Sequence, residues 1–147
     1  MDVQKQDVFG QASWVIETDE VSLAVTERGG MMAPVTFFRS SGTPFSPYYI
    51  NPWHDEKLDI ADPVLRTLRG DFFCMPFGAG GEYEGVSYVS HGEPATERWT
   101  LESGGTEEQA CSGDAGFREI RLSLETRAPA ASITKRLMLR AGENAVY

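Results

Sequence analysis

Two histidines are the residues of this chain best suited to proton transfer. His54 lies in Trp53-His54-Asp55-Glu56, and His91 lies in Ser90-His91-Gly92-Glu93-Pro94. The unperturbed pKa of histidine is close to neutrality, so either ring can serve as an acid or a base. His54, beside two carboxylates, is more typical of a surface loop than of a catalytic group. His91 follows a predicted strand and precedes a glycine, which lets its ring face a hollow, with a purely structural role as the alternative.

Other catalytic arrangements find little support in the spacing. His54-Asp55-Glu56 is the densest cluster of metal-ligand types, but neighbouring side chains on a strand point to opposite faces, so we predict no metal site. The glycine pairs Gly29-Gly30 and Gly80-Gly81 lack nucleotide-loop spacing and are interpreted as turns. The sequence has no Gly-x-Ser-x-Gly motif. Cys74 and Cys111 lie far apart without a Cys-x-x-Cys, and we expect them to be reduced, buried or inert.

Short β-strands must position these residues. Apolar and polar residues alternate in runs at 14–16, 21–25, 120–124 and 133–139. In the last run, Lys135 is the exception to the pattern. Alternation with period two places one set of side chains on a core face and the other outward. Short strands joined by loops predict an all-β fold, an antiparallel β-sandwich or barrel, in a single domain over residues 1–147.

Loops and turns complete the predicted organisation. Residues 40–62 form a long loop whose aromatic residues argue for a role other than disorder. Asp62-Pro63 is placed to cap a short helix through Leu68, with a strand as the close alternative. The remaining expectations are a hairpin turn at 18–20, strands at 34–38, 86–89 and 97–101, a buried run at 72–77, and a surface loop at 103–116.

The last residues carry a further expectation. A strand over 135–140 and a turn over 141–144 are followed by a strand that begins at Ala145 and stops at Tyr147. A strand cut after three residues leaves much of its backbone without a partner. We therefore expect this chain to be the N-terminal part of a longer protein.

Charge and composition exclude several classes of function. Thirteen basic residues against 22 acidic ones give a formal charge of −9. Phosphate backbones and anionic membranes repel such a chain. No stretch approaches the ~20 apolar residues of a membrane span, and the first residues are too polar for a signal peptide. We expect a cytoplasmic protein that binds neither nucleic acid nor membrane.

Several segments occur in an order typical of one known family. They are the hairpin and Gly-Gly turn over 14–38, the run from Gly70 to Gly78 that ends in Pro-Phe-Gly, the His-Gly pair and Trp99 over 88–101, and the strand–turn–strand over 133–147. In these segments the chain resembles the galactose mutarotase-like family, which includes aldose 1-epimerases and hexose-phosphate mutarotases. The resemblance implies a large antiparallel β-supersandwich, of which this chain supplies roughly the first half.

The resemblance also implies a sugar-binding site. In the family, the histidine of the His-Gly pair contacts the sugar at the catalytic centre, and that role falls on His91. A sugar-binding arginine falls on Arg69. Trp99 offers a face for stacking against a sugar, with a core position as the alternative. The sugar-phosphate branch often has an arginine four residues after the histidine, where this chain has Ala95, and Arg98 is displaced from that position.

The implied activity is that of an aldose 1-epimerase. Such an enzyme interconverts α- and β-anomers of a hexose by acid–base ring opening and needs no cofactor. In the family the base is a glutamate and the acid a second histidine, both from the later half, and no histidine follows His91 here. We expect the full-length protein to be an isomerase acting on a monosaccharide or sugar derivative. The alternative is a catalytically silent carbohydrate-binding or structural β-sandwich, and an accessory domain of a lyase or hydrolase is a weaker one.

The oligomeric state follows from the same picture. Half of a sandwich exposes a broad apolar face. On its own, the chain is therefore expected to form a homodimer or to aggregate.

Overall fold

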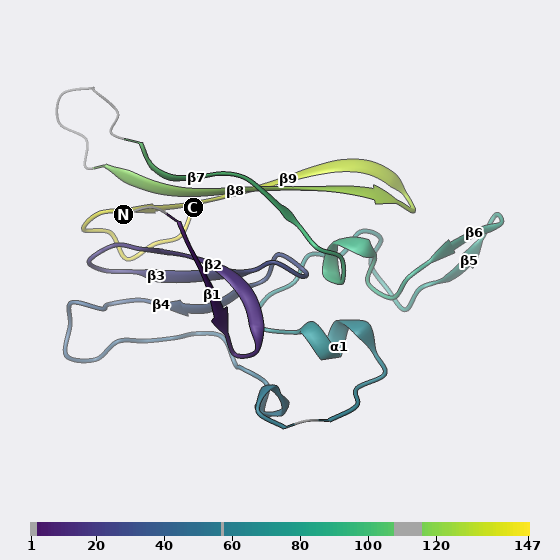
Figure 1. Cartoon of the computed structure of the whole chain (residues 1–147), viewed down its shortest axis with the longest axis horizontal. Coiled ribbons are helices and arrows are strands. Elements are labelled where there is room, and N and C mark those ends of the chain that lie inside the picture. The colour runs from purple at the N-terminus through teal and green to yellow at the C-terminus, as the bar shows by residue number, and fades with distance from the viewer. Residues whose placement is uncertain (1–2, 57, 108–115) are drawn as a thin grey trace.

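The computed structural model describes residues 3–56, 58–107 and 116–147. Its strands form two stacked antiparallel sheets and a small separate hairpin (Figure 1). The first sheet has the order β1 (Gln4–Val8), β2 (Gln11–Glu17), β3 (Ser22–Thr26), β4 (Met32–Thr36). The second has the order β7 (Thr100–Glu107), β8 (Phe117–Arg127), β9 (Ala130–Arg140), and the hairpin pairs β5 (Gly81–Tyr83) with β6 (Val86–Tyr88). The predicted all-β antiparallel sandwich is confirmed.

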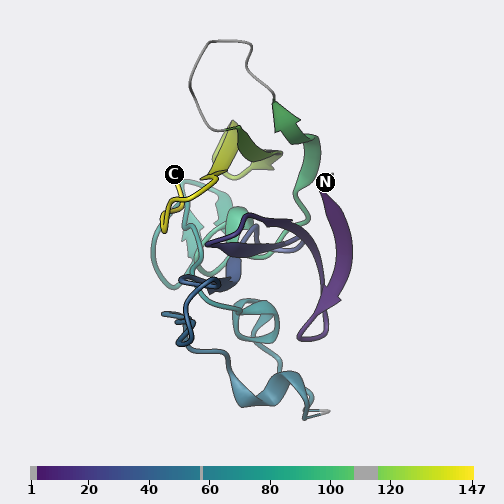
Figure 2. The ribbon, with the colours of Figure 1, turned by 90° about the vertical axis from the view of Figure 1, so that its left-hand side faces the viewer.

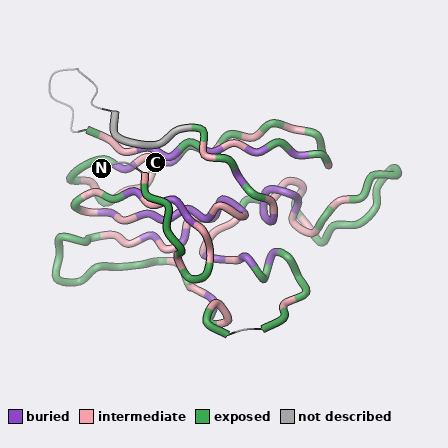
Figure 3. The backbone as a smooth tube through the Cα atoms, in the orientation of Figure 1, coloured by how far each residue is buried: buried purple, intermediate pink, exposed green. Residues whose placement is uncertain are grey.

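The core lies between the two sheets, where buried residues gather along the strands (Figure 3). Inward-facing side chains from both sheets fill it, and the largest contributions come from Trp14, Ile16, Leu23, Val25, Val35, Trp99, Ile120, Leu122, Leu137 and Leu139. Each fully buried side chain of this size stabilises the fold by roughly 1.5–3 kcal/mol. The apolar residues that alternate in the sequence are therefore the ones whose side chains hold the two sheets together.

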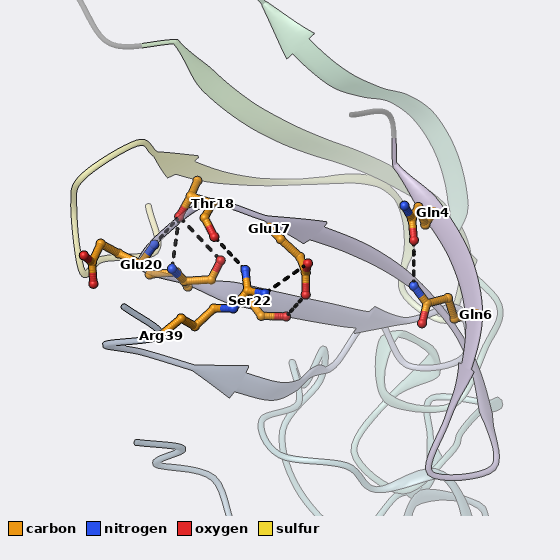
Figure 4. A network of polar contacts seen from close by, with 8 residues as sticks. Gln4, Gln6, Glu17, Thr18, Glu20, Ser22 and Arg39 are labelled. Atoms are coloured by element: carbon orange, nitrogen blue, oxygen red, sulfur yellow. Dashed lines mark hydrogen bonds and ion pairs between the residues drawn. The ribbon is translucent and has the colours of Figure 1, made fainter. Parts of the chain in front are cut away.

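The predicted hairpin between β2 and β3 is confirmed, and its turn is held by Thr18. The Thr18 hydroxyl accepts hydrogen bonds from the backbone N–H groups of Val21 at 3.0 Å and Glu20 at 3.3 Å. Figure 4 shows the polar contacts around this turn. The Arg39 guanidinium donates to the Thr18 carbonyl at 2.6 Å and lies 3.2 Å from the Glu17 carboxylate. A residue just after β4 thus ties the turn to the first sheet.

An irregular segment links β4 to β5 and contains a 3-10 turn, η1 (Pro52–His54), and one turn of helix, α1 (Pro63–Thr67). The Asp62 carboxylate caps α1 by accepting from the N–H groups of Val64 at 2.8 Å and Leu65 at 3.1 Å. Of the two conformations predicted here, the helix is the one that forms. Figures 1 and 2 both place α1 on the side of the first sheet that faces away from the second.

Some sequence-based expectations are wrong. Residues 72–77 form no buried run, since Phe73 and Phe77 are 44% and 86% exposed. β7 continues to Glu107, so the first part of the expected loop over 103–116 is a strand, and residues 108–115, which include Cys111, lie outside the described residues. The segment after Ala145 is not a regular strand, although the backbone of Tyr147 pairs with Met138.

β1 is a strand that the sequence pattern does not predict. Its side chains are mostly exposed, and it lies at the edge of the first sheet. Backbone hydrogen bonds hold it against β2, in a register that runs from Gln4 opposite Val15 to Val8 opposite Gln11. Polar side chains suit an edge strand because they discourage pairing with another chain. Apolar alternation therefore cannot reveal it.

Two carboxylates tie the segments between the sheets together. Glu27, just after β3, lies 2.8 Å from Lys5 of β1 and 2.5 Å from Arg98, which precedes β7. The hydrogen bond from Lys5, reinforced by Arg98, lowers the pKa of Glu27 against the opposing effect of burial. Glu93 in η2 (Glu93–Ala95) is buried and accepts from the backbone N–H of Arg127 at 2.6 Å and from its Nε at 3.0 Å.

Among the described residues, no helix has the length and apolar character that crossing a bilayer requires.

The Glu27 contacts predict an acid-sensitive contribution to stability. Because its folded pKa is depressed, the contribution is present above the unfolded pKa of about 4.3 and is lost as the pH falls through the folded value. We expect Glu27→Gln to lower the free energy of unfolding by about 1 kcal/mol at neutral pH, because the partners are largely exposed. The difference in stability between the two proteins should shrink as the pH is lowered from neutral to about 3. Urea unfolding at both pH values measures this.

Glu125→Gln is the matched control, because Glu125 is an exposed residue of β8. A Glu27→Gln protein as stable as wild type at neutral pH would contradict the assignment.

Candidate functional site

A cavity of about 310 Å³ opens beside the core between β9 and the segment that follows α1. Its walls are mostly apolar and aromatic, with one carboxylate and one amine among Asp71, Phe72, Phe73, Trp99, Ile133, Thr134 and Lys135. We call this the aromatic cavity. Its volume lies at the lower end of the ~300–1,000 Å³ range of small-molecule sites. It therefore has room for a single small ring.

Lys135 places an amine in this cavity because its position on β9 faces inward. It lies opposite Leu122 of β8, whose side chain is fully buried. The Lys135 Nζ donates to the carbonyl oxygen of Gly30 at 2.7 Å and lies 3.7 Å from the Asp71 Oδ2. Burial lowers the pKa of Lys135, and the Asp71 carboxylate opposes that effect. The amine is a polar group in a largely apolar wall.

Asp71 is held in place by the edge of β4. Its Oδ1 accepts a hydrogen bond from the Met32 N–H at 2.5 Å. Gly70, with φ +79°, makes this approach possible, because a Cβ there would lie 2.2 Å from the Met32 carbonyl oxygen. The carboxylate thus has one oxygen fixed by the backbone and the other directed to Lys135 at ion-pair distance.

Trp99 forms another wall and is itself 3% exposed. Its indole N–H donates to the Pro94 carbonyl at 3.0 Å, and the ring packs against Gly30. A Cβ at Gly30 would meet the indole at 3.0 Å, and its φ of +57° also favours glycine. The Gly29-Gly30 pair is the predicted turn. It both accommodates the indole and supplies the carbonyl that Lys135 binds.

His91 contacts Phe72, one of the residues that line the aromatic cavity. Its ring meets Phe72 edge-on at a centroid distance of 5.3 Å, and its Nδ1 is 3.5 Å from the Cys74 Sγ. Burial raises the pKa of that thiol, which therefore stays protonated near neutral pH. Gly92 packs against the Met75 carbonyl, where a Cβ would lie at 2.0 Å, so the His-Gly pair needs its glycine for close backbone approach.

The two arginines predicted for the site lie elsewhere. The Arg69 guanidinium is buried and donates to the carbonyl oxygens of Phe9 at 3.0 Å and Leu68 at 2.8 Å, so it braces the β1–β2 turn. Burial lowers its pKa. The exposed Arg98 is paired with Glu27. Of the four predicted residues, Trp99 lines the aromatic cavity, His91 adjoins it through Phe72, and the arginines are not among the lining residues.

His54, the second histidine considered, is the last residue of η1. Its ring is tilted against Phe9 at a centroid distance of 4.8 Å, and its Nδ1 is 2.9 Å from the Asp55 carboxylate without forming a hydrogen bond. It is not among the residues that line the aromatic cavity. No group of three or more metal-ligand side chains converges anywhere in the described part of the chain.

A second cavity, of about 420 Å³, lies between β4, β9 and the last residues of the chain. Its lining carries no charged side chain and consists of Met32, Val35, Phe37, Pro47, Tyr48, Leu137, Asn144, Ala145, Val146 and Tyr147. The aromatic cavity therefore differs from this second cavity in carrying the charged pair Asp71 and Lys135.

Sequence reasoning misses Asp71 and Lys135 as site residues. The signal for Lys135 is its place among the inward-facing residues of β9, where alternation predicts an apolar side chain. No comparable signal marks Asp71, whose position depends on a backbone contact with β4. Comparison of the chain with protein-family models, curated proteins and solved structures finds no match.

The contact between Gly30 and the indole yields a stability prediction. Gly30→Ala introduces a Cβ against Trp99 and places alanine at positive φ, so we expect a loss of about 1–2 kcal/mol or more. Urea unfolding followed by circular dichroism measures the change. Gly42→Ala is the control, because no heavy atom lies within 4 Å of its added Cβ. Equal stability of the two variants would show that the turn does not support the cavity wall.

Proposed function

We propose that this chain binds a monosaccharide in the aromatic cavity, as part of a mutarotase-type aldose 1-epimerase. A pyranose has an apolar face of C–H groups and a rim of hydroxyls. Phe72, Phe73 and Trp99 supply rings for the apolar face. The carboxylate and the amine supply an acceptor and donors for the hydroxyls. The observation that carries the proposal is this ion pair in the aromatic wall.

The charges of the cavity favour a neutral sugar. Lys135 and Asp71 balance each other, which leaves no net positive charge for a phosphate group. Arg98, the arginine nearest to the position expected for sugar-phosphate binding, is engaged with Glu27. The overall charge of −9 also disfavours an anionic ligand. We therefore favour an unmodified hexose over a sugar phosphate.

Ring opening requires one group to take the anomeric hydroxyl proton and another to protonate the ring oxygen. In the cavity, the Asp71 carboxylate is the available acceptor and the Lys135 ammonium the available donor. His91 adjoins them through Phe72. A catalytically silent carbohydrate-binding module is the second candidate, because no histidine is among the described residues that line this cavity.

Sugar binding is tested with Phe73→Ala. Phe73 lines the cavity but is partly exposed, so its loss should spare the fold while weakening stacking by about 1 kcal/mol, or roughly fivefold in Kd. Titration calorimetry with D-glucose and D-galactose measures this. Phe77→Ala is the control, since Phe77 is 86% exposed and is not a lining residue. Equal weakening by both variants, or no binding of either hexose, would contradict the proposed site.

The epimerase activity is tested by polarimetry on freshly dissolved α-D-glucose and α-D-galactose. An isomerase accelerates the change in optical rotation, and His91→Ala should slow it by about tenfold or more, because the ring supports the wall at Phe72. His54→Ala should leave the rate unchanged, since that ring lies against Phe9. No acceleration by the wild-type chain would leave the silent module as the function. Equal effects of the two variants would show that His91 is the wrong histidine.

A further inference from the structure

We propose that the Lys135 amine forms an imine with small aldehydes that enter the aromatic cavity. The reaction needs no hexose site. Only the idea that the open-chain form of an aldose is the natural aldehyde rests on the proposed function. What carries the inference is an amine on the wall of a ligand-sized cavity, with a carboxylate beside it and aromatic rings around it.

The position of Lys135 combines burial with access. Its side chain is 19% exposed, and it shares the cavity wall with Ile133 and Trp99. An exposed lysine is surrounded by water, which stabilises its charged form. Here most of the side chain is withdrawn from water, in a cavity wall that is largely apolar. A carbonyl group in the cavity would therefore meet the nitrogen with little water between them.

The contacts of the nitrogen can be kept by its neutral form, which is in equilibrium with the ammonium that pairs with Asp71. An ammonium has three N–H donors, and in the part of the chain that the structure describes the Gly30 carbonyl accepts from the Lys135 Nζ at 2.7 Å. The Asp71 Oδ2, at 3.7 Å, is beyond normal hydrogen-bond length, and its partner oxygen is engaged by the Met32 N–H. A neutral amine keeps the bond to Gly30 and has its lone pair left for attack on a carbonyl carbon.

The electrostatic environment of Lys135 also favours a larger fraction of neutral amine. Burial lowers the pKa of Lys135, although the nearby Asp71 carboxylate opposes the change. Desolvation of this kind raises the fraction of neutral, nucleophilic amine near neutral pH.

The bond changes balance without an oxidant or reductant. The neutral nitrogen attacks the aldehyde carbon, the carbonyl electrons move to oxygen, and one proton passes from the nitrogen to that oxygen to give a neutral carbinolamine. Asp71 is placed to accept the second proton from the nitrogen and to deliver it to the hydroxyl as that group leaves as water. Amine and aldehyde thus yield imine and water. A later water attack reverses the sequence.

Reductive trapping tests the proposal on the whole chain. The chain is incubated with glycolaldehyde and cyanoborohydride, and adducts are located by peptide mass spectrometry. The sequence has three lysines, Lys5, Lys57 and Lys135, so each site is resolved separately. We expect Lys135 to be modified about tenfold faster than Lys5, which is exposed and paired with Glu27. Lys135 modified no faster than Lys5 would overturn the proposal.

Two variants sharpen this experiment. Lys135→Met keeps the stem length and should abolish the fast adduct, leaving the slow labelling of Lys5 unchanged. Asp71→Asn keeps the shape but removes the proton acceptor. With each protein compared at the pH of its fastest trapping, so that the loss of the Asp71 charge does not affect the comparison through the fraction of neutral amine, it should slow trapping at Lys135 several-fold in a protein whose thermal unfolding shows it to be folded. Trapping at an undiminished rate in Asp71→Asn would overturn the role given to the carboxylate.

The result is separable from hexose binding. A fast adduct at Lys135 without calorimetric binding of glucose or galactose would refute the proposed function and leave the amine chemistry standing. Hexose binding without a fast adduct would refute the amine chemistry alone.

Discussion

An amine on the inward face of β9 is the constraint around which the candidate site is built. Lys135 occupies a position where its neighbours Leu137 and Leu139 are buried. An isolated charge in such a place is costly, so it must find polar partners. The Gly30 carbonyl and the Asp71 carboxylate provide them. These partners come from distant parts of the chain, and their meeting point is the aromatic cavity.

Close backbone contacts keep those distant segments together. Gly70 sits against the Met32 carbonyl, and Gly92 sits against the carbonyl of Met75. The segment that carries Phe72 and Phe73 is thus held at both ends, by β4 on one side and by the His-Gly turn on the other. This arrangement explains how an irregular segment, with partly exposed rings, presents a defined wall to a ligand.

The sequence predicts the parts of the fold that depend on apolar alternation. The hairpin over 14–25 and the long strands around Ile120 and Leu137 follow from period two, and Asp62 before a proline predicts the start of α1. β1 escapes prediction because backbone pairing with β2 holds it without apolar side chains. Residues 72–77 look buried by composition, yet their position depends on the close approach at Gly70, which no local pattern records.

The candidate site shows the same division. Trp99 is predicted as an aromatic face and does line the cavity, whereas Arg69 is an attractive residue by type that folding directs to the β1–β2 turn. Lys135 leaves a trace in the sequence as a break in alternation, but its partner Asp71 leaves none. Residue type and the inward or outward direction of a strand position can therefore indicate Lys135. The position of Asp71 is fixed by its tertiary contact with the Met32 backbone.

Chemical-shift mapping tests the central claim most directly, because it asks where a hexose touches the chain. A ¹⁵N-labelled sample is titrated with D-galactose while the backbone amide signals are followed. The account predicts saturable shifts that cluster at residues 71–73, 99 and 133–135, the lining of the aromatic cavity. Saturable shifts confined to residues 144–147, at the second cavity, or no saturable shift at all, would contradict it.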